Sequence, residues 1–262
     1  MRALPAARLG LWAYAGAGMA LGASAAVAGP PPLLPLLLGF GGYVVLGTAG
    51  VFWPERGMYG STLWHGPKAQ EIALTFDDGP NPATTPRVLE LLSAASVKAT
   101  FFVVGRKALQ HPQLVRDIAA AGHELGLHGF DHDRLFSLRP PRHVLQDIRR
   151  TQAALAAAGV PEAKLFRPPI GFVSHLTVRG ARRAGVTLVG CSARAFDGFR
   201  AASAERVATR LTRAVQGGAV LALHDAAERD DYVPASIAAL PRVLTALRER
   251  NLRPVTLSTW AC

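Results

Sequence analysis

The sequence predicts an α/β fold built on parallel strands that close into a barrel, preceded by a hydrophobic helical hairpin at the N-terminus. Two observations predict it. From Glu71 onward, short apolar runs alternate with longer amphipathic stretches, the pattern of strand–helix units and of a parallel sheet. Between Leu9 and Trp53, by contrast, there is no Asp, Glu, Lys or Arg.

The apolar N-terminal segment divides at the Pro-rich stretch 29–32 into two halves, residues 9–28 and 33–53. Each half is long enough to cross a bilayer core of about 30 Å as a helix. We therefore expect a membrane hairpin within residues 1–56 and one folded domain over residues 57–262.

Two other interpretations of the first segment remain open. Arg2 and Arg8, an apolar run and the small residues Ala26-Val27-Ala28 also resemble a secretory signal with its cleavage site. The second open interpretation is a soluble protein in which the apolar segments form a buried pair of helices. The hairpin is favoured because the second apolar half still has to be buried.

In the rest of the chain, seven apolar runs are expected to be strands and six amphipathic stretches to be helices. Pro86, Pro112 and Pro234 fall near helix starts, as proline at the first helical position does. Barrels of this type carry their chemistry at the carboxyl ends of the strands. The expected strands are 72–76, 99–104, 124–128, 164–166, 186–192, 219–224 and 254–257, and the expected helices are 85–95, 113–121, 142–158, 176–184, 204–216 and 236–250.

Charge narrows the choice of partners. The chain has 29 Lys and Arg against 18 Asp and Glu, a formal net charge of +11. Aromatic residues are few and are not interleaved with the basic ones, which argues against nucleic acid. A basic domain beside anionic membrane lipid fits this charge, and so does a solvated arginine-rich surface. The sequence predicts no particular oligomeric state.

The side of the membrane depends on which interpretation of the first segment holds. With basic residues at both ends of a hairpin, the positive-inside rule favours a cytoplasmic domain, whereas a cleaved signal would place the domain outside. The two cysteines, Cys191 and Cys262, lack the spacing of a disulfide framework or a thiolate metal site, so we expect both to be structural.

The first predicted strand ends in Asp77 and Asp78, followed by Gly79 and Pro80. Adjacent carboxylates at the end of a buried strand are costly unless a cation or a proton compensates them. Successive side chains diverge, so that one can bind a metal while the other acts beside it as a base. The alternative is a helix N-cap followed by an ordinary Asp-Gly-Pro turn.

The third predicted strand ends at His128, and His132 follows four residues later. Histidines at this spacing can meet one metal when the backbone turns between them, although two solvated histidines give the same pattern. With Asp78 they would provide two nitrogens and one oxygen, a ligand set of catalytic zinc sites.

Three further strand ends carry polar residues. Arg167, followed by Pro168 and Pro169, can bind a carboxylate from a loop that proline stiffens. Asp197 lies beyond the fifth strand, and the sixth ends at His224. Taken singly, each has an ordinary structural explanation, such as a rigid surface loop or a histidine satisfied within the core.

Taken in order, these motifs resemble those of the polysaccharide deacetylase family, also called the NodB-homology domain or carbohydrate esterase family four. They read Asp-Asp-Gly, HxxxH, Arg-Pro-Pro-x-Gly, an aspartate and Leu-x-Leu-His, and the resemblance covers residues 71–260. It implies a distorted (β/α)7-type barrel. It also implies metal-dependent hydrolysis of the carbon–nitrogen amide bond of N-acetylated sugars, from chitin oligomers to peptidoglycan.

The resemblance also assigns a role to each residue by its position. Asp77 would be the catalytic base and His224 the general acid. Arg167 would hold the base, and Asp197 would orient and charge the acid. The implied cofactor is a divalent metal, with Zn²⁺ as the default and Co²⁺ or Ni²⁺ as alternatives. The metal ligands would be Asp78, His128 and His132, and the substrate or oxyanion site would be lined by Pro168, Pro169, Ile170 and Leu223.

Two motifs depart from the family pattern. An aromatic residue is usual at Ile170, and the fourth motif commonly has two aspartates followed by Trp, where this chain has Arg194, Asp197 and Gly198. The missing aromatics and the hairpin favour an N-acetylated envelope or lipid-linked glycan over a long free polymer. The alternatives are a deformylase of a polyprenyl-phosphate-linked N-formyl sugar and a non-catalytic glycan-binding barrel.

Overall fold

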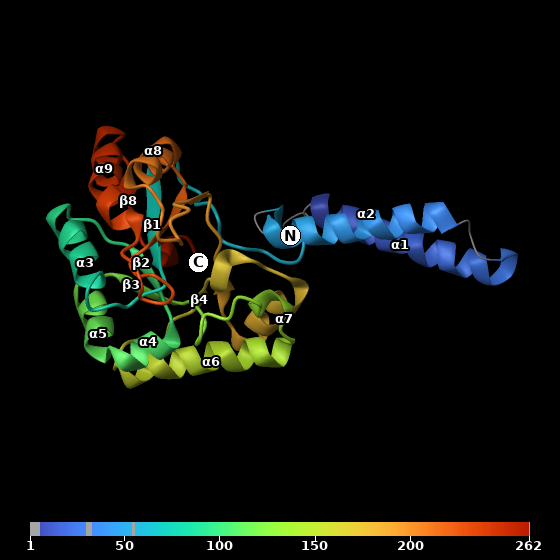
Figure 1. Cartoon of the computed structure of the whole chain (residues 1–262), viewed down its shortest axis with the longest axis horizontal. Helices are drawn as coiled ribbons and strands as arrows, with labels where there is room; N and C mark the ends of the chain where they lie inside the picture. The colour runs from blue at the N-terminus through green and yellow to red at the C-terminus, as the bar shows by residue number, and fades with distance from the viewer. Residues whose placement is uncertain (1–5, 30–32, 54–55, 262) are drawn as a thin grey trace.

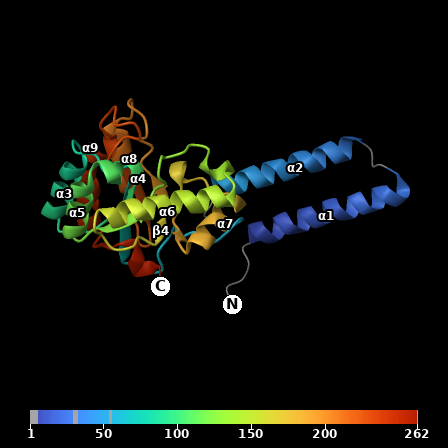
Figure 2. The same ribbon diagram turned by 90° about the horizontal axis from the view of Figure 1, so that it is seen from below.

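The computed structural model describes residues 6–29, 33–53 and 56–261. Two long helices, α1 (Ala6–Ala28) and α2 (Leu33–Phe52), lie side by side and project as a hairpin from an α/β body (Figures 1 and 2). The Tyr14 hydroxyl of α1 donates a hydrogen bond to the Gly39 carbonyl of α2 at 2.8 Å. The predicted hairpin is therefore present as a pair of contacting helices.

Most apolar side chains of the hairpin are exposed, including Phe40 at 68% and Leu38 at 67%. Within the described ranges, α2 is the one helix that is long and apolar enough to cross a membrane. Its place near the N-terminus also fits a signal sequence. The helix α1 does not meet the same criterion of length and hydropathy. Length and composition therefore support one of the two expected membrane spans.

The body is built on a parallel sheet in the order β5-β4-β3-β2-β1-β7-β6, and β8 pairs with β1 outside this path. The outer strands are short, while β1 and β7 are the longest and lie next to each other. The strands are β1 (Glu71–Asp77), β2 (Thr100–Val103), β3 (Glu124–Leu127), β4 (Leu165–Phe166), β5 (Thr187–Leu188), β6 (Ala193–Arg194), β7 (Val220–His224) and β8 (Arg253–Pro254).

One stretch of chain, residues 187–194, links the two ends of the sheet. Its first part, β5, pairs with β4, and its last part, β6, pairs with β7. Between them, Val189 forms a bridge with Leu63, which precedes the barrel. Within the strand expected over 186–192 only β5 forms, and β6 lies just beyond that range. The curled sheet is a distorted (β/α) barrel as predicted.

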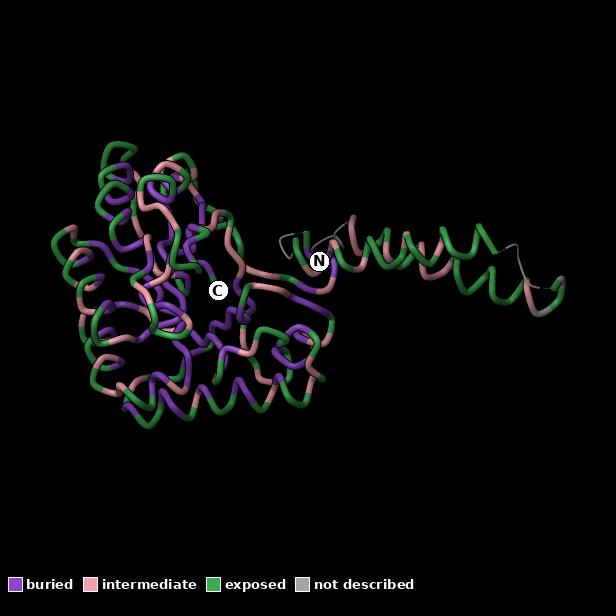
Figure 3. The backbone as a smooth tube through the Cα atoms, viewed as in Figure 1, coloured by how far each residue is buried: buried purple, intermediate pink, exposed green. Residues whose placement is uncertain are grey.

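Helices cover the outer face of the barrel (Figures 1 and 3). Because strand side chains alternate, each strand feeds two apolar layers. Phe76 and Phe101 pack in the layer beneath the helices, and Phe102 and Leu257 pack inside the barrel. The helices are α3 (Thr85–Ala94), α4 (Gly105–Gln110), α5 (Pro112–Ala120), α6 (Pro141–Ala157), α7 (His175–Ala184), α8 (Ala204–Ala214) and α9 (Ala235–Glu249).

Two expectations about these elements were wrong. The sequence pattern did not predict α4, a six-residue helix whose Lys107 is fully buried and bonded to the Ala227 carbonyl at 2.7 Å. The strand expected over 254–257 is only β8, because the chain then turns into a 3-10 helix, Leu257–Trp260. There the Trp260 indole donates to Glu71 Oε2 at 2.6 Å and closes the bottom of the barrel.

Candidate active site

The polar residues singled out in the sequence gather at the carboxyl ends of neighbouring strands. Asp77 is the last residue of β1, and His224 is the last residue of β7 and its register partner. His128 directly follows β3, and Arg167 directly follows β4. Parallel strands end at one rim, so this topology brings together side chains that are far apart in the sequence.

Asp77 is buried and paired with Arg167, which is also buried. The Arg167 guanidinium donates from Nη1 to Asp77 Oδ1 and to Thr75 Oγ1, both at 2.7 Å, and from Nη2 to the Gly190 carbonyl at 2.8 Å. It also lies 4.3 Å from the centre of the Phe102 ring inside the barrel. The carboxylate of Asp77 is therefore fixed by a cation that is itself held on several sides.

Asp78 turns away from Asp77 because its backbone has a φ of 73°, in the left-handed region. Its Oδ1 lies 3.3 Å from His128 Nε2 and 3.1 Å from His132 Nε2. All three residues are buried, and one ligand atom from each lies within 4.8 Å of the others. The predicted trio therefore meets at one point.

The trio fits a divalent metal. The Arg167 carbonyl can only accept a hydrogen bond, so its 2.8 Å contact places the proton of His128 on Nδ1 and a lone pair on Nε2. Within the described residues, Asp78 Oδ1 is buried without a hydrogen-bond partner. An oxygen and imidazole nitrogens that converge with their lone pairs inward repel one another unless a cation lies between them.

Neighbouring charge supports the same interpretation. Burial would raise the pKa of Asp78, but His128 and His132 hold it well below its ordinary value. Burial would lower the pKa of His132, but Asp78 and, more weakly, Glu228 raise it. The carboxylate at this point is thus ionised, and its negative charge favours a positive group beside it.

His224 forms a second pair with Asp197, which is fully buried. His224 Nδ1 lies 2.7 Å from Asp197 Oδ1, and its Nε2 lies 4.0 Å from Asp78 Oδ2. Burial opposes a charge on His224, yet Asp197, Asp78 and Asp77 raise its pKa to about 10. Burial would also raise the pKa of Asp197, but hydrogen bonds from His224 and Ser236 lower it. His224 is therefore a cation facing the Asp78 trio.

The loop after β4 lies beside these groups. Pro168 and Pro169 are buried, whereas Ile170 is 38% exposed at the rim, with a φ of 62°. Leu223, also predicted to line the substrate or oxyanion site, is fully buried in the layer beneath the helices, together with Phe76. Strand alternation places Ala222, not Leu223, on the same face of β7 as His224.

Four residues that contact the site were missed in the sequence. Thr75 holds Arg167, and Ser236 donates through its backbone N–H to Asp197 at 2.9 Å. Glu228 lies 3.7 Å from His132 Nδ1, and Asp147 of α6 accepts the Phe130 N–H at 2.9 Å between the two histidines. The alternation of β1 could have revealed Thr75. The other three come from loops and helices without a pattern that marks them.

Comparison with known proteins gives a consistent result. A family model described as polysaccharide deacetylase matches residues 65–189. The chain is 30% identical over 201 residues to a peptidoglycan-N-acetylglucosamine deacetylase of Bacillus cereus, covering 76% of this chain and 92% of the relative. It is 34% identical over 195 residues to a chitooligosaccharide deacetylase of Sinorhizobium fredii, covering 71% and 89%.

Solved structures agree with these matches. A family 4 carbohydrate esterase from Streptomyces lividans, solved in complex with acetate, superimposes with a TM-score of 0.63 at 30% identity. The match covers 71% of this chain and 91% of that esterase.

Proposed function

Because the chain belongs to the polysaccharide deacetylase family, we propose that it hydrolyses the N-acyl group, first of all an N-acetyl group, of an amino sugar in an envelope or lipid-linked glycan. One observation carries the proposal. A buried carboxylate–arginine pair, a buried ligand trio and a charged histidine face one another at a single rim, where Asp77, Asp78 and His224 lie next to each other.

We assign the metal ligands as Asp78, His128 and His132. When bound there, a divalent cation supplies Lewis-acid chemistry toward the amide carbonyl and an attacking water. Two imidazoles and one carboxylate suit zinc, and cobalt or nickel can take the same donors.

Asp77 is the general base in this proposal. It lies next to Asp78 in sequence but is paired with Arg167 at 2.7 Å instead of belonging to the trio. Arg167 keeps the carboxylate oriented, so Asp77 can accept a proton from the water that attacks the acyl carbon. Thr75 and Gly190, which also bond Arg167, act through it as positioning groups.

His224 is the general acid. An amine anion is a very poor leaving group, so cleavage of the amide needs a proton delivered to nitrogen. The pKa of about 10 keeps His224 protonated at neutral pH. Asp197, hydrogen-bonded to Nδ1, leaves Nε2 free to turn toward the substrate. Pro168 and Pro169 have no N–H, so Ile170 provides the first backbone donor of this loop for the oxyanion.

The membrane is the second part of the proposal. Residues 1–56 anchor the chain to lipid, and residues 57–262 are the catalytic domain. The apolar surface of α2 and the net charge of +11 both suit a position beside an anionic bilayer. Ile170 and Gly198 remove aromatic positions that would stack on a long glycan, which favours a substrate presented at the membrane.

The test is product analysis with purified, zinc-loaded protein. Soluble N-acetylglucosamine oligomers and lipid-linked amino sugars, each with an N-acetyl or an N-formyl group, are incubated separately, and released acetate and formate are quantified. Acetate release supports the proposal, and faster release from the lipid-linked form supports its second part. Release of formate alone would contradict the proposal and indicate a deformylase. If neither product is released from any substrate, the proposal fails and a non-catalytic glycan-binding barrel is the function that remains.

A further inference from the structure

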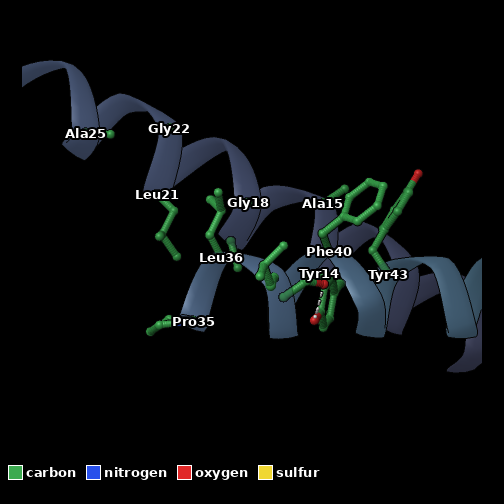
Figure 4. Close-up of a pocket in the computed structure, with 13 residues that line it drawn as sticks. Tyr14, Ala15, Gly18, Leu21, Gly22, Ala25, Pro35, Leu36, Phe40 and Tyr43 are labelled. Carbon is green, nitrogen blue, oxygen red and sulfur yellow. Dashed lines mark hydrogen bonds between the residues drawn. The ribbon is translucent and has the colours of Figure 1, made fainter. Parts of the chain in front are cut away.

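Three apolar grooves follow one another from the hairpin to the barrel. The first, of about 720 Å³, lies between α1 and α2 and is lined by residues such as Leu21, Leu36 and Phe40 (Figure 4). The second, of about 620 Å³, shares Tyr14 with the first and extends to Trp53 at the base of the hairpin. A third, of about 640 Å³, shares Trp53 with the second. Each groove therefore shares one lining residue with the next, so that the three follow one another from the hairpin to the barrel.

The third groove ends against the catalytic loop. Phe52 of α2 packs edge-on against Phe172, with ring centres 4.7 Å apart, and both residues line the groove. Phe172 follows Ile170 by two positions in the loop that begins at Arg167. Arg194, at the other wall, donates to the Ile170 carbonyl at 3.0 Å. A ligand in this groove would thus reach the rim that carries Asp77 and the ligand trio.

The charged side chains that line the third groove are all positive. Arg194 and Arg210 line it together with aromatic residues, and its lining contains no carboxylate. Within the described part of the chain neither arginine forms an ion pair, and Arg210 donates to the Ala195 carbonyl at 2.8 Å. Guanidinium groups without a carboxylate partner are suited to a phosphate. Trp53 and Trp64 beside them are typical of the depth of lipid headgroups.

We infer that the grooves bind the lipid phosphate of the substrate, with the apolar tail along the hairpin and the phosphate at Arg194 and Arg210. The amino sugar then lies over the rim, where His224 and Asp77 act. The inference rests on the proposed function and deepens it, because it names the substrate class as a sugar linked through phosphate to a long-chain lipid. Continuity of the grooves with the catalytic loop favours this occupant over bulk membrane phospholipid.

Direct binding tests the inference without turnover. Full-length protein in neutral detergent is titrated with a long-chain isoprenoid monophosphate, and tryptophan fluorescence is followed because Trp53 and Trp64 line the grooves. The same isoprenoid as its alcohol, inorganic phosphate and phosphatidylglycerol are the comparison probes. The monophosphate is expected to bind at least about tenfold more tightly than the alcohol, the effect of one charge-assisted contact. It should also bind more tightly than inorganic phosphate, which lacks the apolar tail, and than phosphatidylglycerol, which has the phosphate but not the isoprenoid chain. Equal affinity for the alcohol or for phosphatidylglycerol would overturn the inference.

Variants locate the phosphate. R194Q/R210Q is expected to weaken monophosphate binding by about tenfold or more, while Arg213→Gln, which removes one positive charge from α8, the helix of Arg210, outside the third groove, should leave it unchanged. An unchanged double variant, or an equal loss in Arg213→Gln, would overturn the assignment. His128→Ala should abolish deacetylation but keep monophosphate binding. Loss of the proposed enzymatic activity can therefore be distinguished from loss of the inferred lipid-phosphate site.

Discussion

Asp197 Oδ1 lies 2.7 Å from His224 Nδ1, and this contact sets both the charge and the direction of the histidine at the rim. Asp197 itself is fixed by Ser236 through its backbone N–H and its hydroxyl. The buried Asp197 and Ser236 thus hold the partly exposed imidazole of His224 in place. Its other nitrogen, Nε2, faces the Asp78 carboxylate.

Asp197→Asn tests this support through pH. A general acid works only while protonated, and Asp197 helps to raise the pKa of His224 to about 10. Removing that negative charge lowers the pKa, so the alkaline limb of the kcat/KM profile should move to lower pH by about one to three units. An alkaline limb that stays in place, with only the overall rate reduced, would contradict the role of Asp197.

Asp77→Asn separates the base from the metal ligands. The amide oxygen can still accept from Arg167, but it cannot take a proton from water, so kcat should fall by at least about a hundredfold. Zinc content, measured by atomic emission, should equal that of the unaltered protein. Asp78→Ala is the matched comparison at the neighbouring position and should lose zinc as well as activity. Full activity of Asp77→Asn would rule out the base assignment.

Glu228→Gln tests a group outside the trio. Glu228 Oε1 lies 3.7 Å from His132 Nδ1, and Arg134 holds the carboxylate at 2.6 Å. A negative charge this close to a metal-binding imidazole increases its basicity, so its loss should weaken zinc affinity by about ten- to a hundredfold. Competition with a zinc chelator measures this. Arg242→Gln, which breaks a different exposed ion pair, should have no effect.

Asp147→Ala tests the support of the loop between the two histidines. Asp147 accepts the Phe130 N–H, and burial raises the pKa of its carboxyl to about 6. The alanine variant leaves a backbone donor unpaired, so the free energy of unfolding should fall by about 1–3 kcal/mol, and zinc affinity should fall with it. Asp147→Asn keeps an acceptor and should preserve zinc affinity. Denaturant titration and chelator competition on both variants decide the point.

Much of the site was predictable because chemistry in a parallel barrel lies at strand ends. Asp77, His128, Arg167 and His224 each follow an apolar run in the sequence, and the structure brings them to one rim. The structure places Leu223 beneath the helices, on the other face of β7 from His224, and the sequence already contained the information for this. Side chains alternate along β7, so the residue on the face of His224 is two positions before it, Ala222, and not its neighbour.

Other features had no sequence signal. Glu228, Ser236 and Asp147 reach the site from segments whose local pattern describes only their own helix or loop. The strands β5 and β6 have two residues each, which is too few to show alternation. In α4, Lys107 gives the sequence the appearance of a solvated turn, although its ammonium group is buried against the Ala227 carbonyl and Asp230. These elements are fixed by tertiary contacts, not by local periodicity.

The most direct measurement is a zinc titration of protein stripped of metal, with acetate release from an N-acetylglucosamine oligomer as the signal. We expect no release before zinc is added, then a linear rise, and a plateau at about one zinc ion per chain, because Asp78, His128 and His132 form one site. Full acetate release by the stripped protein, or an unchanged titration in a variant with alanine at His128 and His132, would contradict it.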